Sequence, residues 1–206
     1  MGLNALDESH SRANLPKQAR ARETYERLIT AAQIILEEGG LEALNSNAVA
    51  AQAGTTPPSF YRYFGNKYDL LAELGRRLMN AQNSIIERRA GEGGPERYSQ
   101  RAMEAVLAET LRVTRAYRGG RAIISSLRAV PELSPIRLES HAYIARLMAR
   151  EIGAGKRGKA KAEMYVRARL AVELGYAAIE MLLEVQGLDE RRVLESAARA
   201  IKAGLS

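Results

Sequence analysis

Cysteine and tryptophan are absent from this chain, and histidine occurs only twice, as His10 and His141. A chain without cysteine forms no disulfide bond and cannot use a thiol in catalysis, which fits a cytoplasmic protein. The two histidines stand far apart in the sequence, so little is available for a metal site or for a nucleophile activated by histidine. We therefore expect no metal, no cofactor and no catalytic residue, and we do not expect an enzyme.

Long hydrophobic runs are missing as well. No stretch free of charged residues is long enough to cross a bilayer, and residues 170–185 are interrupted by Glu173 and Glu180. The first residues of the chain lack a basic segment followed by an apolar one, so no secretory signal is visible. These absences predict a cytoplasmic location and no membrane partner.

The net charge is +7, which is the sign expected for a protein that binds nucleic acid. The excess is uneven: residues 1–71 carry seven basic and eight acidic side chains, and residues 72–206 carry the other 24 and 16. Bulk charge therefore does not mark the half of the chain that binds DNA. A local basic cluster precedes and begins the first expected helix: Arg12, Lys17, Arg20, Arg22 and Arg27.

Residues 1–19 are expected to form a flexible N-terminal arm. A basic arm can lie along a DNA backbone or enter a minor groove. The alternative is a disordered, solvated tail without DNA contacts, which we favour for residues 1–17.

Apolar residues recur at helical spacing along most of the chain, and no run alternates apolar and polar residues like a half-buried strand. We therefore predict an all-α fold of about nine helices. Two of them are short and follow Leu44. The other helices are expected at residues 25–40, 66–89, 96–117, 121–129, 134–152, 160–186 and 189–203.

The two short helices have the signals of a helix-turn-helix. Asn45 and Ser46 are N-cap types before the first of them, and Gly54 follows its last periodic residue, where a left-handed conformation ends a helix. Thr56 then caps the second helix, and Pro57 stands at its first position, where a missing N–H is no loss. Such a pair of helices can enter a DNA major groove.

The segment around these helices resembles a known family. An amphipathic helix ends at Gly40, an Ala-Ala-Gln-Ala-Gly segment covers residues 50–54, and an aromatic run at residues 59–64 precedes Asn66 and Lys67. In this order and spacing, residues 22–71 resemble the DNA-binding domain of the TetR family of bacterial transcriptional regulators. The resemblance implies a three-helix DNA-binding domain at residues 20–68. It also implies a larger helical domain for ligand sensing and dimerisation at residues 69–206.

In a helix-turn-helix, side chains near the start of the second helix read base edges, and flanking groups hold phosphates. Arg62 can bond guanine or hold a phosphate, and Asn47 could read adenine. Tyr61 and Lys67 match positions that contact phosphate in the family. For Tyr63, packing in the protein core and contact with DNA both remain open. The DNA-binding residues that we expect are Arg20, Arg22, Ser46, Asn47, Thr56, Pro57, Ser59, Tyr61, Arg62, Tyr63 and Lys67.

The expected helix at residues 160–186 is apolar around nearly its whole circumference, so it must be covered on more than one side. The simplest interpretation is that it and the last helix pair with their copies in a twofold homodimer, as the family resemblance also implies. The alternative is an interior helix of a monomer. The interface residues that we expect are Ala171, Gly175, Ala178, Leu182, Leu194, Ala197, Ala198 and Ile201.

The resemblance further implies a small-molecule pocket in the larger domain and a repressor that its effector releases from a palindromic operator. Plain hydrophobic core is the alternative for the candidate lining. That lining is Met79, Met103, Leu107, Leu111, Ile123, Leu127, Tyr143, Leu147, Met148 and Tyr176.

Two other functions stay open. The larger domain could serve only dimerisation or protein contacts, with no ligand. The chain could also be a helical enzyme, but its apolar-flanked acids, Glu173 and Glu180, are seven residues apart and have no histidine or cysteine nearby in sequence, which makes a poor catalytic set.

Overall fold

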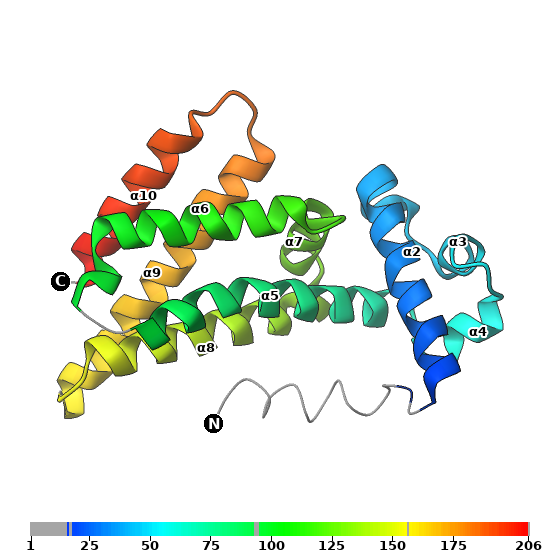
Figure 1. Cartoon of the computed structure of the whole chain (residues 1–206), viewed down its shortest axis with the longest axis horizontal. Helices are drawn as coiled ribbons and strands as arrows, with labels where there is room; N and C mark the ends of the chain where they lie inside the picture. The colour runs from blue at the N-terminus through cyan, green and yellow to red at the C-terminus, as the bar shows by residue number, and fades with distance from the viewer. Residues whose placement is uncertain (1–15, 17, 93–94, 156, 206) are drawn as a thin grey trace. The chain divides into compact units, whose positions relative to one another are not determined.

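The computed structural model describes residue 16 and residues 18–92, 95–155 and 157–205. Within these residues the chain forms nine α-helices, two short 3₁₀-helices and no strand, which confirms the predicted all-α fold (Figure 1). Residues 1–15 and 17 of the expected N-terminal arm lie outside the described residues.

The boundaries agree with the sequence patterns to within a few residues, except that α2 begins earlier and the expected helix at residues 96–117 divides into η1 and α6. The elements are α2 (Ala19–Ala43), α3 (Ser46–Gln52), α4 (Pro57–Tyr61), α5 (Lys67–Glu92), η1 (Pro95–Tyr98), α6 (Gln100–Ala116), α7 (Gly120–Ala129), η2 (Pro131–Leu133), α8 (Ser134–Ile152), α9 (Gly158–Glu184) and α10 (Glu190–Leu205).

The chain divides into two compact units. The first contains the described residues up to Leu78 together with residues 117–136, and the second contains residues 79–116 and the described residues from 137 onward. From the sequence we expected the division after residue 68, with residues 117–136 in the larger domain. The difference arises because α7 packs on α2. A Cβ atom on Gly119, just before α7, would lie only 3.0 Å from Cβ of Leu36.

The core of the first unit forms on one face of α2. Its buried residues recur three and four positions apart, as an amphipathic helix requires: Tyr25, Leu28, Ile29, Ala32 and Leu36. The helical backbone breaks at Gly40, which has φ 65° and ψ −162°. This conformation is unfavourable for other residues, so the glycine ends the straight part of the helix as predicted.

An ion cluster joins α2 to α5 within this unit. The guanidinium of Arg77 donates to both carboxylate oxygens of Glu26, over 2.7 and 2.8 Å, and its Nε donates to Glu73 over 2.8 Å. Glu73 is buried and also pairs with Arg76 over 3.3 Å. Bidentate arginine–carboxylate pairs impose a defined geometry. The cluster therefore fixes the orientation of α2 against the start of α5.

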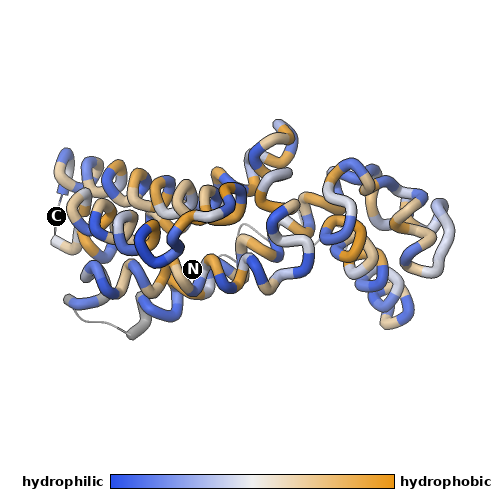
Figure 2. The backbone as a smooth tube through the Cα atoms, turned by 90° about the horizontal axis from the view of Figure 1, so that it is seen from above, coloured by the Kyte–Doolittle hydropathy of each residue, from blue (hydrophilic) through white to orange (hydrophobic). Residues whose placement is uncertain are grey.

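In the second unit, α10 packs on α9 and on α6. The apolar residues of α10 recur three and four positions apart and form one buried stripe: Leu194, Ala197, Ala198, Ile201 and Leu205. Figure 2 shows that hydrophobic and hydrophilic residues alternate along the helices. Among the described residues, no helix is both long and apolar enough to cross a membrane.

The two sides of α9 differ sharply in exposure. One side is buried in the chain's own core and includes Ala168, Ala171, Val172, Gly175 and Ile179. The other side carries large apolar residues that remain exposed; we call them the α9 stripe. They are Val166, Leu170, Leu174, Met181 and Val185, with exposures of 40–65%.

Candidate nucleic-acid interface

The first helix of the helix-turn-helix, α3, starts where its cap predicts. The side chain of Asn45 accepts a hydrogen bond from the backbone N–H of Ala48 over 2.9 Å, which satisfies one of the unpaired donors of the first turn. Gly54 follows the helix with φ 61°, and the N–H of Thr55 bonds to the carbonyl of Ala50 over 2.9 Å. The turn therefore has the left-handed glycine that the sequence predicted.

Thr56 caps the second helix, α4, by its backbone conformation but not by its side chain. Its hydroxyl instead lies 3.2 Å from the hydroxyl of Ser59, and Pro57 occupies the first helical position. The expected backbone signals are thus confirmed. The two hydroxyl groups that we expect to meet DNA are already paired with each other in the free protein.

Aromatic packing anchors α4. Phe60 and Phe64, four residues apart, are 0% and 4% exposed. Phe64 stacks on Tyr25 of α2 with 5.1 Å between ring centroids, and Tyr63 meets the same ring edge-on at 6.0 Å. Because these contacts hold one side of α4, the opposite side, with Tyr61 and Arg62, stays exposed.

A hydrogen bond links the two helices on their exposed side. The hydroxyl of Tyr61 at the end of α4 lies 2.9 Å from the hydroxyl of Ser46 at the start of α3. Tyr61 is 55% exposed although it is a large aromatic residue. The pair places hydroxyl groups from both helices at one point of the surface, where a phosphate oxygen could accept from the hydroxyl proton that their mutual bond does not use.

Lys67 begins α5 just beyond the recognition helix. Asn66 caps this helix, because its side-chain oxygen accepts from the N–H groups of Tyr68 and Asp69 over 2.7 and 3.1 Å. Asp69 accepts in turn from the N–H of Gly65 over 2.9 Å. The ammonium group of Lys67 lies 5.5 Å from the ring centroid of Tyr68, so its position is defined although its charge is not paired with an acid there.

The basic residues at the start of α2 are also exposed. Arg20 and Arg22 lie in its first turn, and Nε of Arg22 donates to the carbonyl of Pro16 over 2.8 Å. The eleven expected DNA-binding residues all belong to the first unit. Six of them are exposed, namely Arg20, Arg22, Asn47, Thr56, Tyr61 and Arg62, and five are half-buried, namely Ser46, Pro57, Ser59, Tyr63 and Lys67.

The eight expected dimer-interface residues belong to the second unit, whereas the expected DNA-binding residues belong to the first. All of them are buried in the core of the second unit, where α6, α9 and α10 meet. A Cβ atom on Gly175 would lie 3.1 Å from a methyl carbon of Leu107 and 3.7 Å from one of Ile201, both in the same chain. Gly175, expected at the dimer interface, therefore faces residues of its own chain. The large apolar side chains that remain exposed along α9 are those of the α9 stripe.

The ten expected pocket residues are divided between the two units. Ile123 and Leu127 of α7 belong to the core of the first unit, where Leu127 approaches Gly75. The other eight belong to the second unit. Within it, Tyr143 donates to Glu87 over 2.7 Å, and burial together with this bond raises the pKa of Tyr143 to about 12. These residues were grouped by hydrophobic spacing, which does not distinguish one core from another.

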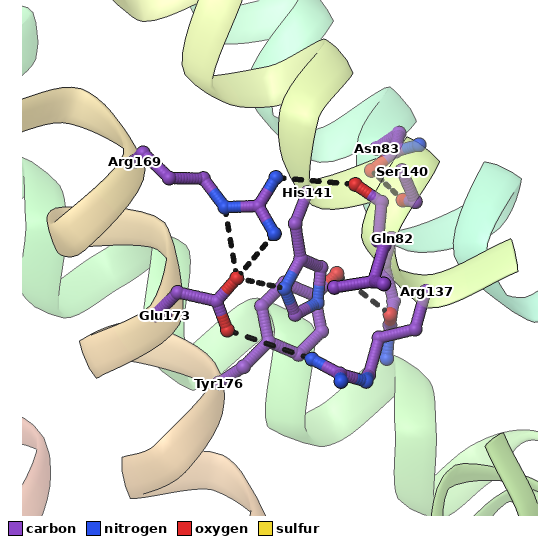
Figure 3. Close-up of polar contacts among 9 residues, drawn as sticks. Gln82, Asn83, Arg137, Ser140, His141, Arg169, Glu173 and Tyr176 are labelled. Carbon is purple, nitrogen blue, oxygen red and sulfur yellow. Dashed lines mark hydrogen bonds and ion pairs between the residues drawn. The ribbon is translucent and has the colours of Figure 1, made fainter. Parts of the chain in front are cut away.

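A buried polar cluster in the second unit was missed from the sequence; we call it the His141 cluster (Figure 3). Nδ1 of His141 lies 3.1 Å from Glu173, and its ring stacks on that of Tyr176 at 4.0 Å between centroids. Tyr176 donates to Gln82 over 2.9 Å, and Ser140 donates to Asn83 over 3.1 Å.

Burial lowers the pKa of His141 to about 4, although its bond to Glu173 acts in the opposite direction. The ring is therefore neutral at pH 7 and donates from Nδ1 to the carboxylate. The sequence held one signal for this cluster: His141 lies on the same helical face as Ile144, Ala145 and Met148. The residues that meet it from α5 and α9 could not be identified without the fold.

Comparisons with known proteins agree with the helix-turn-helix. Residues 28–74 match the sequence family described as bacterial regulatory proteins, tetR family. Over 94 residues the chain is 34% identical to the HTH-type transcriptional repressor DrrR1 of Streptomyces coeruleorubidus. That match covers 46% of this chain and 33% of the relative, so the matched region spans about a third of the relative's length.

Solved structures share the whole fold at low sequence identity. A tetR-family transcriptional regulator from Streptomyces coelicolor superposes with a TM-score of 0.69 and 15% identity, covering 88% of this chain and 80% of the other. The regulator FadR from Bacillus subtilis, solved in complex with stearoyl-CoA, gives 0.65 and 18%, covering 88% and 100%. The sequence match therefore identifies residues 28–74 as a TetR-family DNA-binding domain of bacterial transcriptional regulators, and the solved structures show that the other helices share their fold.

Proposed function

We propose that this regulator binds a palindromic operator as a homodimer and represses transcription until a small-molecule effector releases it. The observation that carries the proposal is the exposed side of α4. Arg62 and Tyr61 remain free of the core because Phe60 and Phe64 hold the opposite side of the helix. A helix presented in this way can lie in a major groove with its polar side toward the bases.

In the proposed complex, Arg62, Ser59 and Thr56 approach base edges, and Asn47 approaches them from α3. Lys67 and the Ser46–Tyr61 pair hold phosphates beside the recognition helix. Arg20 and Arg22 lie at the start of α2 and add contacts to the backbone or to a minor groove. Phosphate contacts of this kind release counterions, so binding weakens steeply as salt rises.

The proposed dimer contact uses the α9 stripe. Beside it runs an apolar groove between α9 and α10, lined by Leu174, Ala177, Met181, Val193, Ala197 and Ala200. Large apolar residues in a row are unusual on the surface of a monomer and commonly mark an interface. A second copy related by a twofold axis would place the same stripe against this one and bury both.

The effector is proposed to bind in the second unit. The fold is shared with a FadR regulator that was solved with stearoyl-CoA, which supports a ligand-binding role for the corresponding helices here. The competing proposal is a ligand-independent regulator whose second unit serves only dimerisation. It requires no ligand site, because the α9 stripe alone would supply the dimer contact.

Selection of DNA sequences from a random pool tests the operator. The expected result is an enriched inverted repeat whose half-sites are about 34 Å apart, which is one turn of the double helix. Enrichment of a single, non-repeated half-site, or of no sequence, would contradict the proposed dimeric complex. A thermal-shift screen then separates a ligand-responsive regulator from a ligand-independent one, because a ligand that binds the folded state raises the melting temperature.

A further inference from the structure

Three buried polar atoms in the second unit have no hydrogen-bond partner in the structure: Nδ2 of Asn83, Nε of Arg137 and Nε2 of His141. Asn83 and His141 are each 1% exposed. Unpaired polar atoms at such depth are rare in folded proteins, because burial removes their bonds to water. All three residues belong to the His141 cluster, where α5, α8 and α9 contribute side chains (Figure 3).

The hydrogen bonds that these residues already make determine whether each unpaired atom is a donor or an acceptor. Oδ1 of Asn83 accepts from Ser140, so its Nδ2 is a free donor. Arg137 approaches Glu173 through its terminal nitrogen at 3.6 Å, which leaves its Nε–H as a second donor. Nδ1 of His141 donates to Glu173, so Nε2 of the neutral ring is an acceptor, and it becomes a third donor when the ring is protonated.

The charged groups that act on His141 are Glu173, Arg137 and Arg169. Arg137 and Arg169 are both cationic, and Glu173 is the single carboxylate that they share, at 3.6 and 2.6 Å. With His141 neutral, these groups sum to one positive charge. An anion placed among them would balance it, and it would also stabilise a protonated His141.

The cluster reaches the surface on one side. The side chains of Arg137 and Arg169 are each 23% exposed and that of Glu173 is 38% exposed, whereas the side chain of His141 is 1% exposed. A small molecule could therefore approach between the arginines and reach the buried atoms as these long side chains move.

We propose that the His141 cluster binds the carboxylate group of a small organic acid, with Arg137 and Asn83 donating to its two oxygens and His141 donating to one of them. The inference rests on the proposed function, because it assigns a chemical class to the effector of the second unit. A neutral amide matches the site less well, since it leaves the positive charge unbalanced and cannot stabilise a protonated histidine.

Histidine NMR gives a direct test, because the chain has only two histidines. The full-length protein is titrated at pH 7 with benzoate or octanoate, and in parallel with benzamide or octanamide. We expect the carboxylates to shift the ring signals of His141 saturably toward those of the protonated ring. The amides should leave these signals in place, and the His10 signals serve as an internal reference for changes in pH.

A pair of arginine variants on α8 tests the geometry. Arg137→Gln removes the charged donor, and Arg146→Gln removes the same charge at an exposed position on the same helix. We expect the first variant to bind benzoate or octanoate about tenfold more weakly or worse, because a charge-assisted hydrogen bond is lost. The second variant should bind like the unmodified protein.

The inference is overturned if neither carboxylate shifts the His141 signals, if the amides shift them equally, or if the two arginine variants bind equally well. Operator binding is measured separately by fluorescence anisotropy. A protein that binds its inverted repeat but no carboxylate refutes this site and leaves the regulator intact. A protein that binds the carboxylate but no inverted repeat supports the site and refutes the proposed regulation.

Discussion

Nδ1 of His141 lies 3.1 Å from a carboxylate oxygen of Glu173, although the two residues stand on different helices and the histidine is almost fully buried. Burial lowers the pKa of the histidine to about 4. Partial burial acts to raise the pKa of Glu173, but its hydrogen bonds to His141 and Arg169 outweigh that effect and lower it. Both groups therefore make the fold less stable in acid.

The first prediction concerns stability between about pH 6.5 and pH 4. In this range the unfolded chain takes up a proton at His141 while the folded chain does not, so the free energy of unfolding falls as pH falls. The contribution of this residue is up to about 3 kcal/mol. Guanidinium unfolding at several pH values should show a steeper acid loss for the unmodified protein than for His141→Asn. Equal pH dependence of the two proteins would contradict the assignment of a neutral, buried histidine.

The second prediction separates phosphate contacts from base contacts. Lys67→Ala should weaken binding to all DNA sequences alike and reduce the slope of log affinity against log salt by about one. Arg62→Ala should instead change which base is preferred in each half-site, with a loss of about 1–3 kcal/mol for the preferred one. Arg191→Ala, which removes an exposed charge from α10, is the control and should change neither property. A change of base preference in Lys67→Ala would reverse the assigned roles.

The third prediction tests the α9 stripe. Leu170→Glu and Met181→Glu should each yield a monomer by sedimentation while circular dichroism stays unchanged, because these side chains are 65% and 40% exposed and do not support the core. Operator affinity should fall with the dimer, since the two half-sites would then be bound independently. Ala108→Glu adds the same charge at an exposed position on α6 and should remain dimeric. Dimers of native mass in both stripe variants would place the interface elsewhere.

The fourth prediction concerns Gly175. Gly175→Leu should lower the free energy of unfolding by about 1–3 kcal/mol or more, because the added side chain has to displace Leu107 and Ile201. Gly204→Ala is the matched control on α10: no heavy atom lies within 4 Å of its added Cβ, and alanine favours a helix over glycine by about 0.5–1 kcal/mol. Chemical denaturation of both variants gives the comparison. Full stability of Gly175→Leu would show that the α6–α9–α10 core can open at this position.

Local sequence patterns determined most of the secondary structure and the helix-turn-helix. Asn45, Gly54 and Pro57 act within one or two turns of the chain, so their effects on α3 and α4 follow from conformational preferences alone. The burial of Phe60 and Phe64 followed from their helical spacing, and the same periodicity identified the apolar face of α10. The family resemblance was carried by these same residues.

Tertiary structure decided which apolar face meets which neighbour. Helical periodicity showed that α9 is apolar on several sides, but it could not show that Gly175 faces Leu107 and Ile201 while Leu170 faces solvent. In the same way, His141 and Glu173 are 32 residues apart, and nothing local to either residue indicates the other. Contacts between distant helices depend on how the helices pack, so only the folded chain placed a histidine, a carboxylate and two arginines together.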